Sequence, residues 1–331
     1  MIIHLKNIVA EEEAQRIAEE LQAILIAKEE FVLVTPSKLQ ELPAHLTSKV
    51  SKAVAVPNDI QLASKLYMNE TRSITIGDTT IGGSSNNTLM ITGPCSVENE
   101  EQIEKAAKFC VEQGVKVLRA GCYKPRTSPY SFQGLGLQGL KLLAKMRDKY
   151  GLKIITEVRD ASHVDDVIEY TDIIQIGAKA MYDHGILRRC GEARKPVLLK
   201  RGFGSTLQEF VQAAEFILSG GNNEVILCER GIRTFETNTR FTLDLCGVAF
   251  LKEKTNLPVI LDPSHAMGYA YGVPDLARAC VAMGIEGLLI ESHPTPKEAW
   301  SDAAQQLNFD EYAELLASLK SVAQAVGRKL V

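Results

Sequence analysis

Basic and hydroxyl side chains crowd one short stretch of the chain, residues 117–136, which reads VLRAGCYKPRTSPYSFQGLG. An apolar run ends there at Arg119, and a loop follows that holds Lys124, Arg126, Thr127 and Ser128 between and beside two prolines. Guanidinium, ammonium and hydroxyl groups are the usual donors to phosphate, and prolines stiffen a loop before its ligand binds. The stretch therefore predicts a strand followed by a phosphate-binding loop, with a solvated basic loop as the alternative.

Composition restricts the partners that such a loop could serve. The 331 residues are 45% hydrophobic and 24% charged, as in an ordinary globular protein, and the net charge is -4. This balance argues against nucleic acid or an anionic membrane as the main partner. No apolar run reaches the roughly 20 residues that cross a bilayer, and the acidic N-terminal stretch is unlike a signal peptide. Because the seven cysteines also stand singly, we expect a cytoplasmic protein with reduced thiols.

A strand-then-helix unit recurs through most of the chain and indicates a parallel sheet. Eight strands are predicted, at 89–92, 115–118, 153–156, 173–176, 197–199, 225–227, 259–261 and 288–290. Eight such units match a (β/α)8 TIM barrel, whose typical length is about 250 residues. A doubly wound open sheet is the alternative, which the lack of a GxGxxG after any strand disfavours.

A smaller unit precedes the predicted barrel. Residues 1–67 alternate between a strand at 2–9, a helix at 11–25 and a strand at 31–34, which suggests a small ferredoxin-like α+β domain. This domain is either regulatory or an appendage for folding or oligomerisation. Residues 68–88 predict a β-hairpin with Gly-Asp at its turn and a linker, and residues 89–331 form the barrel.

Polar residues that follow the predicted strands fall into two groups by charge. The C-terminal ends of barrel strands meet at one face, where barrel enzymes place their chemistry. Four basic residues there could converge on one anion: Arg119, Lys124, Lys200 and Arg230. Closure of the barrel sets the last strands beside the first, so four other residues could converge on a cation: Cys95, His265, Glu291 and Asp302.

The donor atoms of the second group define the metal it could hold. One sulfur, one nitrogen and two carboxylates suit Mn, Fe, Co or Zn better than Mg or Ca. Three of the four also have an ordinary interpretation, the cysteine as a small core residue and the histidine and Asp302 as helix caps. No compact ligand spacing such as HExxH supports the metal, so both interpretations stay open at this point.

Seven strings in the barrel resemble those of 3-deoxy-D-arabino-heptulosonate 7-phosphate (DAHP) synthase, in the type I beta form with an N-terminal ferredoxin-like domain. They are GPCSVE at 93–98, KPRTSPYSFQGLG at 124–136, IQIGA at 174–178, PVLLKRGF at 196–203, ILCERGIRTFE at 226–236, LDPSHA at 261–266 and IESHPTP at 290–296. The resemblance covers residues 88–325. It implies a divalent metal, a homotetramer, and a transferase that condenses phosphoenolpyruvate with erythrose 4-phosphate in the first step of the shikimate pathway to aromatic amino acids.

The resemblance also implies roles for single residues. The metal ligands would be Cys95, His265, Glu291 and Asp302. Phosphoenolpyruvate would be held by Arg119, Lys124, Lys200 and Arg230, with its phosphate at Ala178 and Lys179, and the sugar phosphate by Arg126, Thr127 and Ser128. The family usually has GAR where this chain has Gly177, Ala178 and Lys179. Lysine keeps the charge but lacks the two-pronged guanidinium, so we expect a weaker hold on the phosphate.

The chemistry expected of this set is an aldol-type condensation. A metal held by Cys95 and His265 would polarise the sugar aldehyde, and the enol carbon of phosphoenolpyruvate would attack it. Water would then add to C2, and phosphate would leave by C–O cleavage. We expect Lys124 to donate a proton to the developing alkoxide and Glu157 to orient the water.

Two other functions remain as alternatives. The first is synthesis of 3-deoxy-D-manno-octulosonate 8-phosphate from arabinose 5-phosphate, a sister reaction. The family that catalyses it has a loop that resembles KANRS where this chain has KPRTS. The second is a noncatalytic regulator that binds phosphorylated metabolites on the same fold. For the N-terminal domain, the resemblance suggests feedback inhibition by an aromatic amino acid, tyrosine or phenylalanine.

Overall fold

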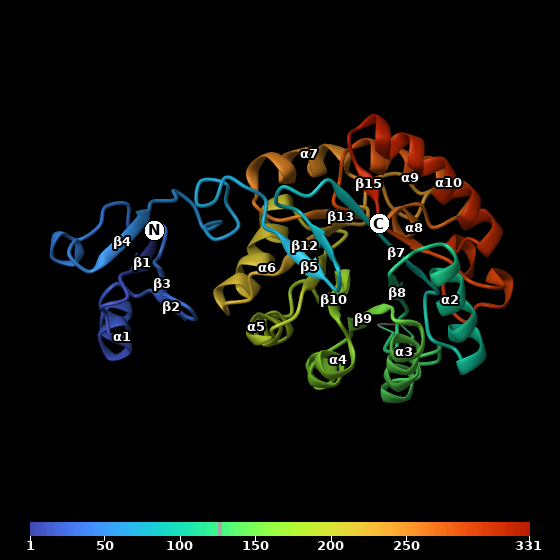
Figure 1. Cartoon of the computed structure of the whole chain (residues 1–331), viewed down its shortest axis with the longest axis horizontal. Helices are drawn as coiled ribbons and strands as arrows, with labels where there is room; N and C mark the ends of the chain where they lie inside the picture. The colour runs from blue at the N-terminus through green and yellow to red at the C-terminus, as the bar shows by residue number, and fades with distance from the viewer. Residues whose placement is uncertain (125–127) are drawn as a thin grey trace.

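The computed structural model describes residues 1–124 and 128–331. Figure 1 shows two parts, a small N-terminal lobe and a large barrel ringed by helices. The barrel strands are β7 (Asn87–Gly93), β8 (Val117–Arg119), β9 (Lys153–Val158), β10 (Ile173–Ile176), β11 (Val197–Lys200), β12 (Val225–Glu229), β13 (Val259–Leu261) and β14 (Gly287–Glu291). They pair in parallel in sequence order, and β14 pairs with β7 to close the barrel. The predicted fold is confirmed.

Buried side chains form one layer inside the barrel and another outside it. The inner layer contains β-branched and leucine side chains from the strands, such as Ile91, Ile155 and Leu198. The outer layer lies between the strands and the helices α2 (Glu100–Glu112), α3 (Leu137–Tyr150), α4 (Val164–Tyr170), α5 (His184–Glu192), α6 (Leu207–Ser219), α7 (Leu245–Lys254), α8 (Pro263–Met267), α9 (Val273–Ala282) and α10 (Phe309–Ala325). Strands buried on both faces explain the continuous apolar runs in the sequence.

Local sequence signals fix the ends of several helices. α6 begins at a capping box, in which Thr206 and Glu209 bond to each other's backbone N–H, and α10 begins at another, formed by Asn308 and Glu311. A short last strand, β15 (Lys329–Leu330), follows α10 and pairs with the beginning of β7. The C-terminal helix is thereby tied to the first barrel strand.

A two-stranded hairpin covers the N-terminal end of the barrel. β5 (Ile74–Ile76) and β6 (Thr79–Ile81) are antiparallel, and Gly77, at φ 63°, lies in the Gly-Asp turn between them. Ile74, Ile76 and Ile81 pack into the inner layer of the barrel. These apolar side chains therefore separate the C-terminal face, where the chemistry is predicted, from solvent at the N-terminal end of the barrel.

The N-terminal lobe contains a four-stranded antiparallel sheet in the order β2-β3-β1-β4, with its own apolar cluster. Its elements are β1 (Ile2–Leu5), α1 (Glu11–Glu20), β2 (Ile24–Ala27), β3 (Phe31–Val34), a 3-10 turn (Ala44–Leu46) and β4 (Val50–Val54). The prediction of a helix over 11–25 was wrong at its end. The chain turns at Gln22, with φ 51°, because the apolar Ile24–Ala27 pairs with β3 as a strand.

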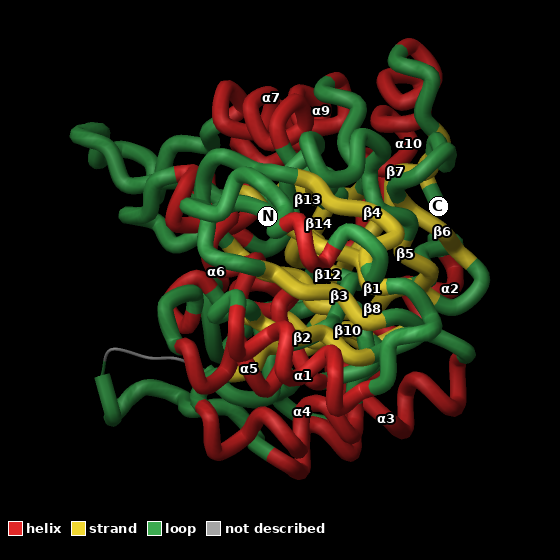
Figure 2. The backbone as a smooth tube through the Cα atoms, turned by 90° about the vertical axis from the view of Figure 1, so that its left-hand side faces the viewer, coloured by secondary structure: helices red, strands yellow, loops and turns green. Residues whose placement is uncertain are grey.

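The lobe and the barrel meet at α6. The Glu215 carboxylate accepts the N–H of Leu62 at 3.1 Å and of Ala63 at 2.8 Å, and the buried Arg72 donates to the carbonyl oxygen of Leu62 at 2.8 Å. Figure 2 shows the lobe from its own side, with its sheet in front of the barrel. Among the described residues, no helix combines the length and apolarity that crossing a bilayer requires.

Candidate active site

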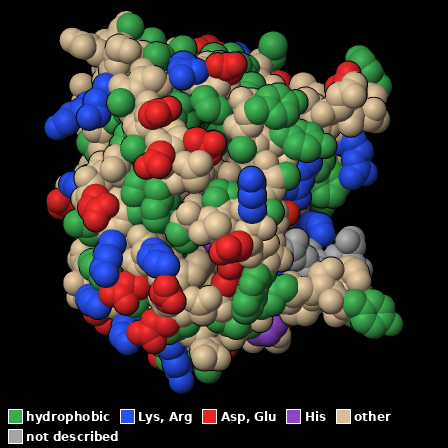
Figure 3. Space-filling view, turned by 90° about the vertical axis from the view of Figure 1, so that its right-hand side faces the viewer, with side chains coloured by type: hydrophobic (Ala, Val, Ile, Leu, Met, Phe, Trp, Pro, Cys, Tyr) green, Lys and Arg blue, Asp and Glu red, His purple; other side chains and the backbone are tan. Residues whose placement is uncertain are grey.

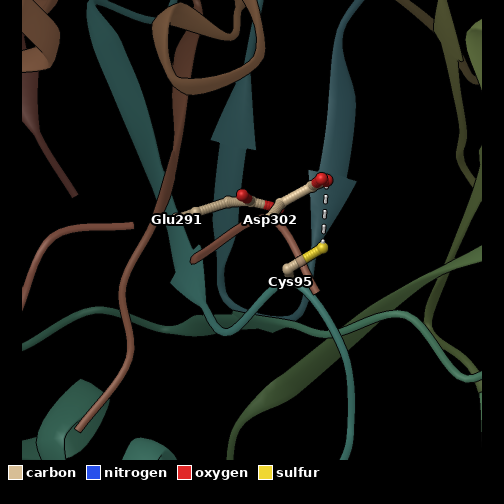
Figure 4. A group of neighbouring side chains, drawn as sticks. All are labelled: Cys95, Glu291 and Asp302. Carbon is tan, nitrogen blue, oxygen red and sulfur yellow. Dashed lines mark hydrogen bonds between the residues drawn. The ribbon is translucent and has the colours of Figure 1, made fainter. Parts of the chain in front are cut away.

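Donor groups from distant parts of the chain meet at the C-terminal face of the barrel. The thiol of Cys95 and the carboxylates of Glu291 and Asp302 each offer one ligand atom, and these atoms lie within 4.8 Å of one another. Figure 4 shows the three side chains together, with Cys95 Sγ 3.4 Å from Asp302 Oδ2. His265 lies beside them, because its Nε2 is 3.5 Å from Glu291 Oε1. The structure therefore brings together the four residues predicted as one group.

Closure of the barrel explains why these residues meet. Glu291 is the last residue of β14, which pairs with β7, and Cys95 follows β7 by two residues. His265 lies in α8, which begins directly after β13, and its backbone N–H donates to the N-cap Asp262 at 3.0 Å. Asp302 lies between β14 and α10 in a left-handed backbone conformation, with φ 47°.

The imidazole of His265 is oriented by a buried acid. Its Nδ1 lies 2.7 Å from Asp262 Oδ2, and Lys200 Nζ lies 2.5 Å from the same oxygen. Burial lowers the pKa of His265, and although burial also opposes ionisation of Asp262, His265 and Lys200 hold the pKa of that acid well below its ordinary value. The imidazole is thus neutral at neutral pH, with Nδ1 against the acid and Nε2 toward Glu291 and the cluster, a placement that suits a metal-binding histidine.

The thiol of Cys95 lies in contact with a lysine. Lys124 Nζ donates to Cys95 Sγ at 3.0 Å and to the carbonyl oxygen of Cys95 at 2.9 Å. Burial raises the pKa of Cys95 to about 11, and the charge of Glu291 acts in the same direction. Burial opposes the charge on Lys124, but the anionic form of Cys95 and the nearby carboxylates outweigh it and raise the pKa of Lys124.

The glutamate of the cluster is held from two sides. Arg119 Nη1 donates to Glu291 Oε1 at 2.9 Å and also to the carbonyl oxygen of Pro94. Gln305 Nε2 donates to Glu291 Oε2 at 2.6 Å. Burial alone would raise the pKa of Glu291, but His265 and Arg119 lower it. The carboxylate is therefore ionised and fixed in place.

The arrangement fits a divalent transition metal. Ligands at about 2.0–2.3 Å from one ion lie no more than about 4.6 Å from each other, close to the separations seen among the three donors. A buried thiol whose pKa is high needs a cation to become a thiolate, and a cation would also be stabilised by the carboxylates of Glu291 and Asp302. Sulfur, imidazole and carboxylate donors together suit Mn, Fe, Co or Zn.

A cavity of about 370 Å3 opens beside the cluster. The basic side chains that line it are Lys124, Lys179, Lys200, Arg230, Arg233 and Arg240, and the acids are Glu157 and Asp302. Arg230 stacks on the ring of Phe241, 4.4 Å from its centroid, and its buried Nη1 has no hydrogen-bond partner among the described residues. A chain of net charge -4 thus concentrates positive charge in one concave site, which suits a polyanionic ligand.

An acid stands on the wall of this cavity in a fixed position. Gln175 Nε2 donates to Glu157 Oε2 at 2.9 Å. The other oxygen lies against Gly177, where an added Cβ would come within 2.0 Å of Glu157 Oε1. A side chain at position 177 would therefore push the Glu157 carboxylate from its place.

The predicted substrate-binding residues fall into three groups by position. Lys124, Ala178, Lys179, Lys200 and Arg230 line the cavity, whereas Arg119 lies buried beneath it against Glu291. Ser128 is held in its own loop, where its hydroxyl accepts the N–H of Tyr130 at 3.3 Å. Arg126 and Thr127 lie outside the described residues.

Other residues of the site were not assigned from the sequence. Arg240 and Phe241 lie in the long segment between β12 and α7, and Gln305 lies beyond β14. These residues do not directly follow a strand, so an assignment based on the strand ends does not include them. Arg233 does follow β12, but nothing in the sequence showed that it stacks on Phe203, 4.8 Å from the ring centroid.

On the face that carries α2 and α10, the described side chains of both charges are mixed (Figure 3). Figure 3 shows acidic and basic side chains interspersed on the side that faces right in Figure 1, which carries α2 and α10. Pairs such as Lys145 with Glu100 and Lys149 with Glu104 join α3 to α2 on the surface. Basic charge is gathered instead in the cavity described above.

This fold and site define a barrel protein with a concave basic cavity beside a cluster of buried donor groups, and comparison with known proteins gives the family. Residues 63–328 match the model of the DAHP synthetase I family. The chain is 46% identical over 281 residues to phospho-2-dehydro-3-deoxyheptonate aldolase of Thermotoga maritima, covering 85% of this chain and 82% of the relative. The crystal structure of DAHP synthase from the same organism matches with a TM-score of 0.81 at 40% identity, covering 100% of this chain and 99% of the other.

A more distant relative carries the name of a different enzyme. It is 2-dehydro-3-deoxyphosphooctonate aldolase of Geobacter sulfurreducens, 31% identical over 270 residues, covering 76% of this chain and 98% of the relative. The chain belongs to the DAHP synthetase I family, and it is an enzyme, a transferase of the DAHP synthase class. The noncatalytic alternative is therefore not supported.

Proposed function

We propose that this enzyme catalyses the metal-dependent condensation of phosphoenolpyruvate with D-erythrose 4-phosphate and water to give DAHP and phosphate, the first step of the shikimate pathway. The observation that carries the proposal is the contact between two features. One is the cluster of Cys95, Glu291 and Asp302 with His265 beside it, and the other is a cavity lined by six basic side chains. Asp302 and His265 belong to both. Family membership supports the same reaction.

The metal would be Mn, Fe, Co or Zn, held by Cys95, His265, Glu291 and Asp302. When bound, it would supply Lewis-acid polarisation of the sugar aldehyde. The contacts of Asp262 with His265 and of Gln305 with Glu291 support this assignment, because such outer partners orient the ligands of protein metal sites.

Phosphoenolpyruvate would bind to Arg119, Lys124, Lys200 and Arg230, with its phosphate near Ala178 and Lys179. The unpartnered nitrogens of the buried Arg119 and Arg230, counted among the described residues, support this assignment because an anion would satisfy them. The sugar phosphate would bind to Arg126, Thr127 and Ser128. Two anionic substrates in one cavity need the surrounding positive charge for binding and for orientation.

Lys124 would act as the general acid. Its pKa is raised, although burial works against its charge, so the ammonium is fully protonated at neutral pH. The enol carbon C3 of phosphoenolpyruvate forms the new bond to the aldehyde carbon, and the aldehyde oxygen takes a proton from Lys124 as its charge develops. The lysine also touches Cys95, which places the proton donor beside the metal-ligand cluster.

Glu157 would orient the water that completes the reaction. Loss of the enol π bond leaves C2 electron-poor, and water adds there while Glu157 accepts its proton. The C2–O bond to phosphate then breaks, and phosphate leaves with the bonding pair while the new C2 hydroxyl forms the ketone and gives its proton to the departing phosphate. The fixed position of this carboxylate between Gln175 and Gly177 supports the role.

Parallel assays with two aldehydes test the substrate. We expect the wild type to consume phosphoenolpyruvate and release phosphate with erythrose 4-phosphate, and to react poorly with arabinose 5-phosphate. The KPRTS sequence at 124–128 supports the shorter sugar. Preference for arabinose 5-phosphate would overturn the substrate assignment but not the fold or the family.

We further propose that residues 1–67 form a regulatory domain, that 68–88 form a linker with a hairpin, and that 89–331 form the catalytic barrel. The separate apolar cluster of the lobe supports this division. Feedback inhibition by tyrosine or phenylalanine is the proposed signal. Deletion of residues 1–67 should leave an active barrel that no aromatic amino acid inhibits; unchanged inhibition would refute the regulatory role.

The resemblance also supports a homotetramer that works in the cytoplasm. Light scattering coupled to size exclusion tests the assembly, and the expected mass is four times that of the 36.3 kDa chain. A monomeric or dimeric mass would contradict it.

A further inference from the structure

Two metal-ligand residues of the proposed site lie in adjacent loops rather than in strands. Cys95 lies between β7 and α2, and Asp302 lies between β14 and α10. Among the described non-glycine residues, only Asp302 and Gln22 have a left-handed backbone, with φ 47° at Asp302. The left-handed conformation costs free energy for any residue with a side chain, although less for Asp than for most others. Something near Asp302 must therefore hold it in place.

Four buried side chains join the two loops on both sides of the ligands. Ser96 Oγ lies 2.7 Å from Ser301 Oγ. Glu98 Oε1 accepts the N–H of Trp300 at 2.8 Å. Gln306 Oε1 accepts the N–H of Cys95 at 2.9 Å, and its Nε2 donates to the carbonyl oxygen of Ser301 at 2.9 Å. The residues adjoining Cys95 are thus bonded to the residues adjoining Asp302.

The glutamate of this set is itself fixed in position. Glu98 is 6% exposed, and its Oε2 lies 3.4 Å from Nε2 of His293, which is 3% exposed. Nδ1 of that histidine accepts the N–H of Thr295 at 3.0 Å, so Nε2 carries the proton and donates to Glu98. Gln102 donates to the carbonyl oxygen of Ser96 at 3.1 Å from the other side. Glu98 is thus a buried carboxylate outside the ligand cluster, and its hydrogen bond to Trp300 holds the second loop in place.

We propose that Ser96, Glu98, Ser301 and Gln306 form a loop clamp that sets the spacing of Cys95 Sγ and Asp302 Oδ2 and, through it, the affinity for the divalent cation. The inference rests on the metal site of the proposed function. These four are positioning residues, because the contacts described above join them to each other and to the backbone of the two loops. If the contacts between the loops are lost, Asp302 leaves its left-handed conformation and the distance from the thiol to its carboxylate increases.

Cobalt binding tests the clamp without reference to activity. The variants are Glu98→Ala, Glu98→Gln, Ser96→Ala, Ser301→Ala and the double serine variant, with cobalt affinity and the thiolate-to-cobalt charge-transfer band as readouts. Loss of outer contacts commonly weakens metal binding about 10-fold to 100-fold, and we expect that loss in Glu98→Ala. Glu98→Gln should recover most of the affinity, because its amide oxygen can still accept the Trp300 N–H. The double serine variant should bind no more weakly than either single variant, since all three lack the same contact.

A matched control separates positioning from stability. Thr171 lies just before β10 at the opposite end of the barrel, and its buried hydroxyl donates to the carbonyl oxygen of Ile154 at 2.8 Å. Thr171→Val removes this hydroxyl, so it should lower the melting temperature but leave cobalt affinity unchanged. If Glu98→Ala fails to fold, the serine variants carry the test. Wild-type affinity and an unchanged band in the folded variants would overturn the clamp. A wild type that binds no cobalt would refute the metal site itself, a distinct result.

Discussion

The thiol of Cys95 lies 3.4 Å from the carboxylate of Asp302, although 207 residues separate them in the sequence. Pairing of β14 with β7 creates this proximity, and the loops that follow these two strands complete it. The same closure sets Glu291 and His265 beside the pair. The donor cluster is thus a consequence of the barrel topology, and it forms only when the last strand pairs with the first.

Lys179→Arg tests the departure from the usual family sequence. Lys179 lines the cavity, and arginine would offer a two-pronged donor where lysine offers a point charge. We expect the KM for phosphoenolpyruvate to fall about tenfold. One added charge-assisted hydrogen bond contributes about 1.4 kcal/mol, and that free energy corresponds to a tenfold change in affinity. Steady-state kinetics measure the change. An unchanged KM would show that the side chain at this position does not contact the phosphate.

Gly177→Ala tests the role of Glu157 without replacing the acid. A methyl group at position 177 would lie 2.0 Å from Glu157 Oε1, so the carboxylate must move and lose its bond from Gln175. If Glu157 orients the water, kcat should fall about 100-fold, while cobalt binding stays as in the wild type. The matched control is Gly204→Ala, whose new methyl meets no atom within 4 Å. Equal kcat in the two variants would refute the role of Glu157.

Much of the architecture followed from the sequence because it depends on local patterns. The eight barrel strands lie where apolar runs predicted them, and β10 and β13 have the predicted bounds. The grouping of Cys95, His265 and Glu291 could be inferred because a residue directly after a strand has only one place to lie in a closed barrel.

Other parts of the site could not be predicted, since they depend on how long segments fold back. Arg240 reaches the cavity from the middle of the β12–α7 segment, and Gln305 reaches Glu291 from beyond β14. The loop clamp is likewise absent from any sequence pattern, because Glu98 and Trp300 are 202 residues apart. At Ile24, tertiary pairing with β3 overrode the helical pattern that precedes it.

Glu215→Gln tests a pH dependence at the contact between the lobe and the barrel. Burial raises the pKa of Glu215 to about 7, from an ordinary value of 4.5. Between these values the folded protein holds a proton that the unfolded chain has released, so this group's contribution to stability is fully present below 4.5 and is lost as the pH rises through about 7.

The free energy of unfolding of the wild type, measured by denaturant titration, should therefore fall from about pH 5 to about pH 8 relative to that of Glu215→Gln. Glutamine carries no charge over this range, although it keeps only one acceptor for the N–H groups of Leu62 and Ala63. Parallel curves for the two proteins would show that Glu215 does not titrate in this range.

Removal of the metal is the most direct test of the account. The wild type, stripped with a chelator and assayed with phosphoenolpyruvate and erythrose 4-phosphate, should form no DAHP, and added manganese or cobalt should restore the rate. Cys95→Ala should fold, show no thiolate-to-cobalt band and stay inactive with either metal. Full activity of the stripped wild type, or a wild-type rate in Cys95→Ala, would contradict the proposed role of the Cys95 cluster.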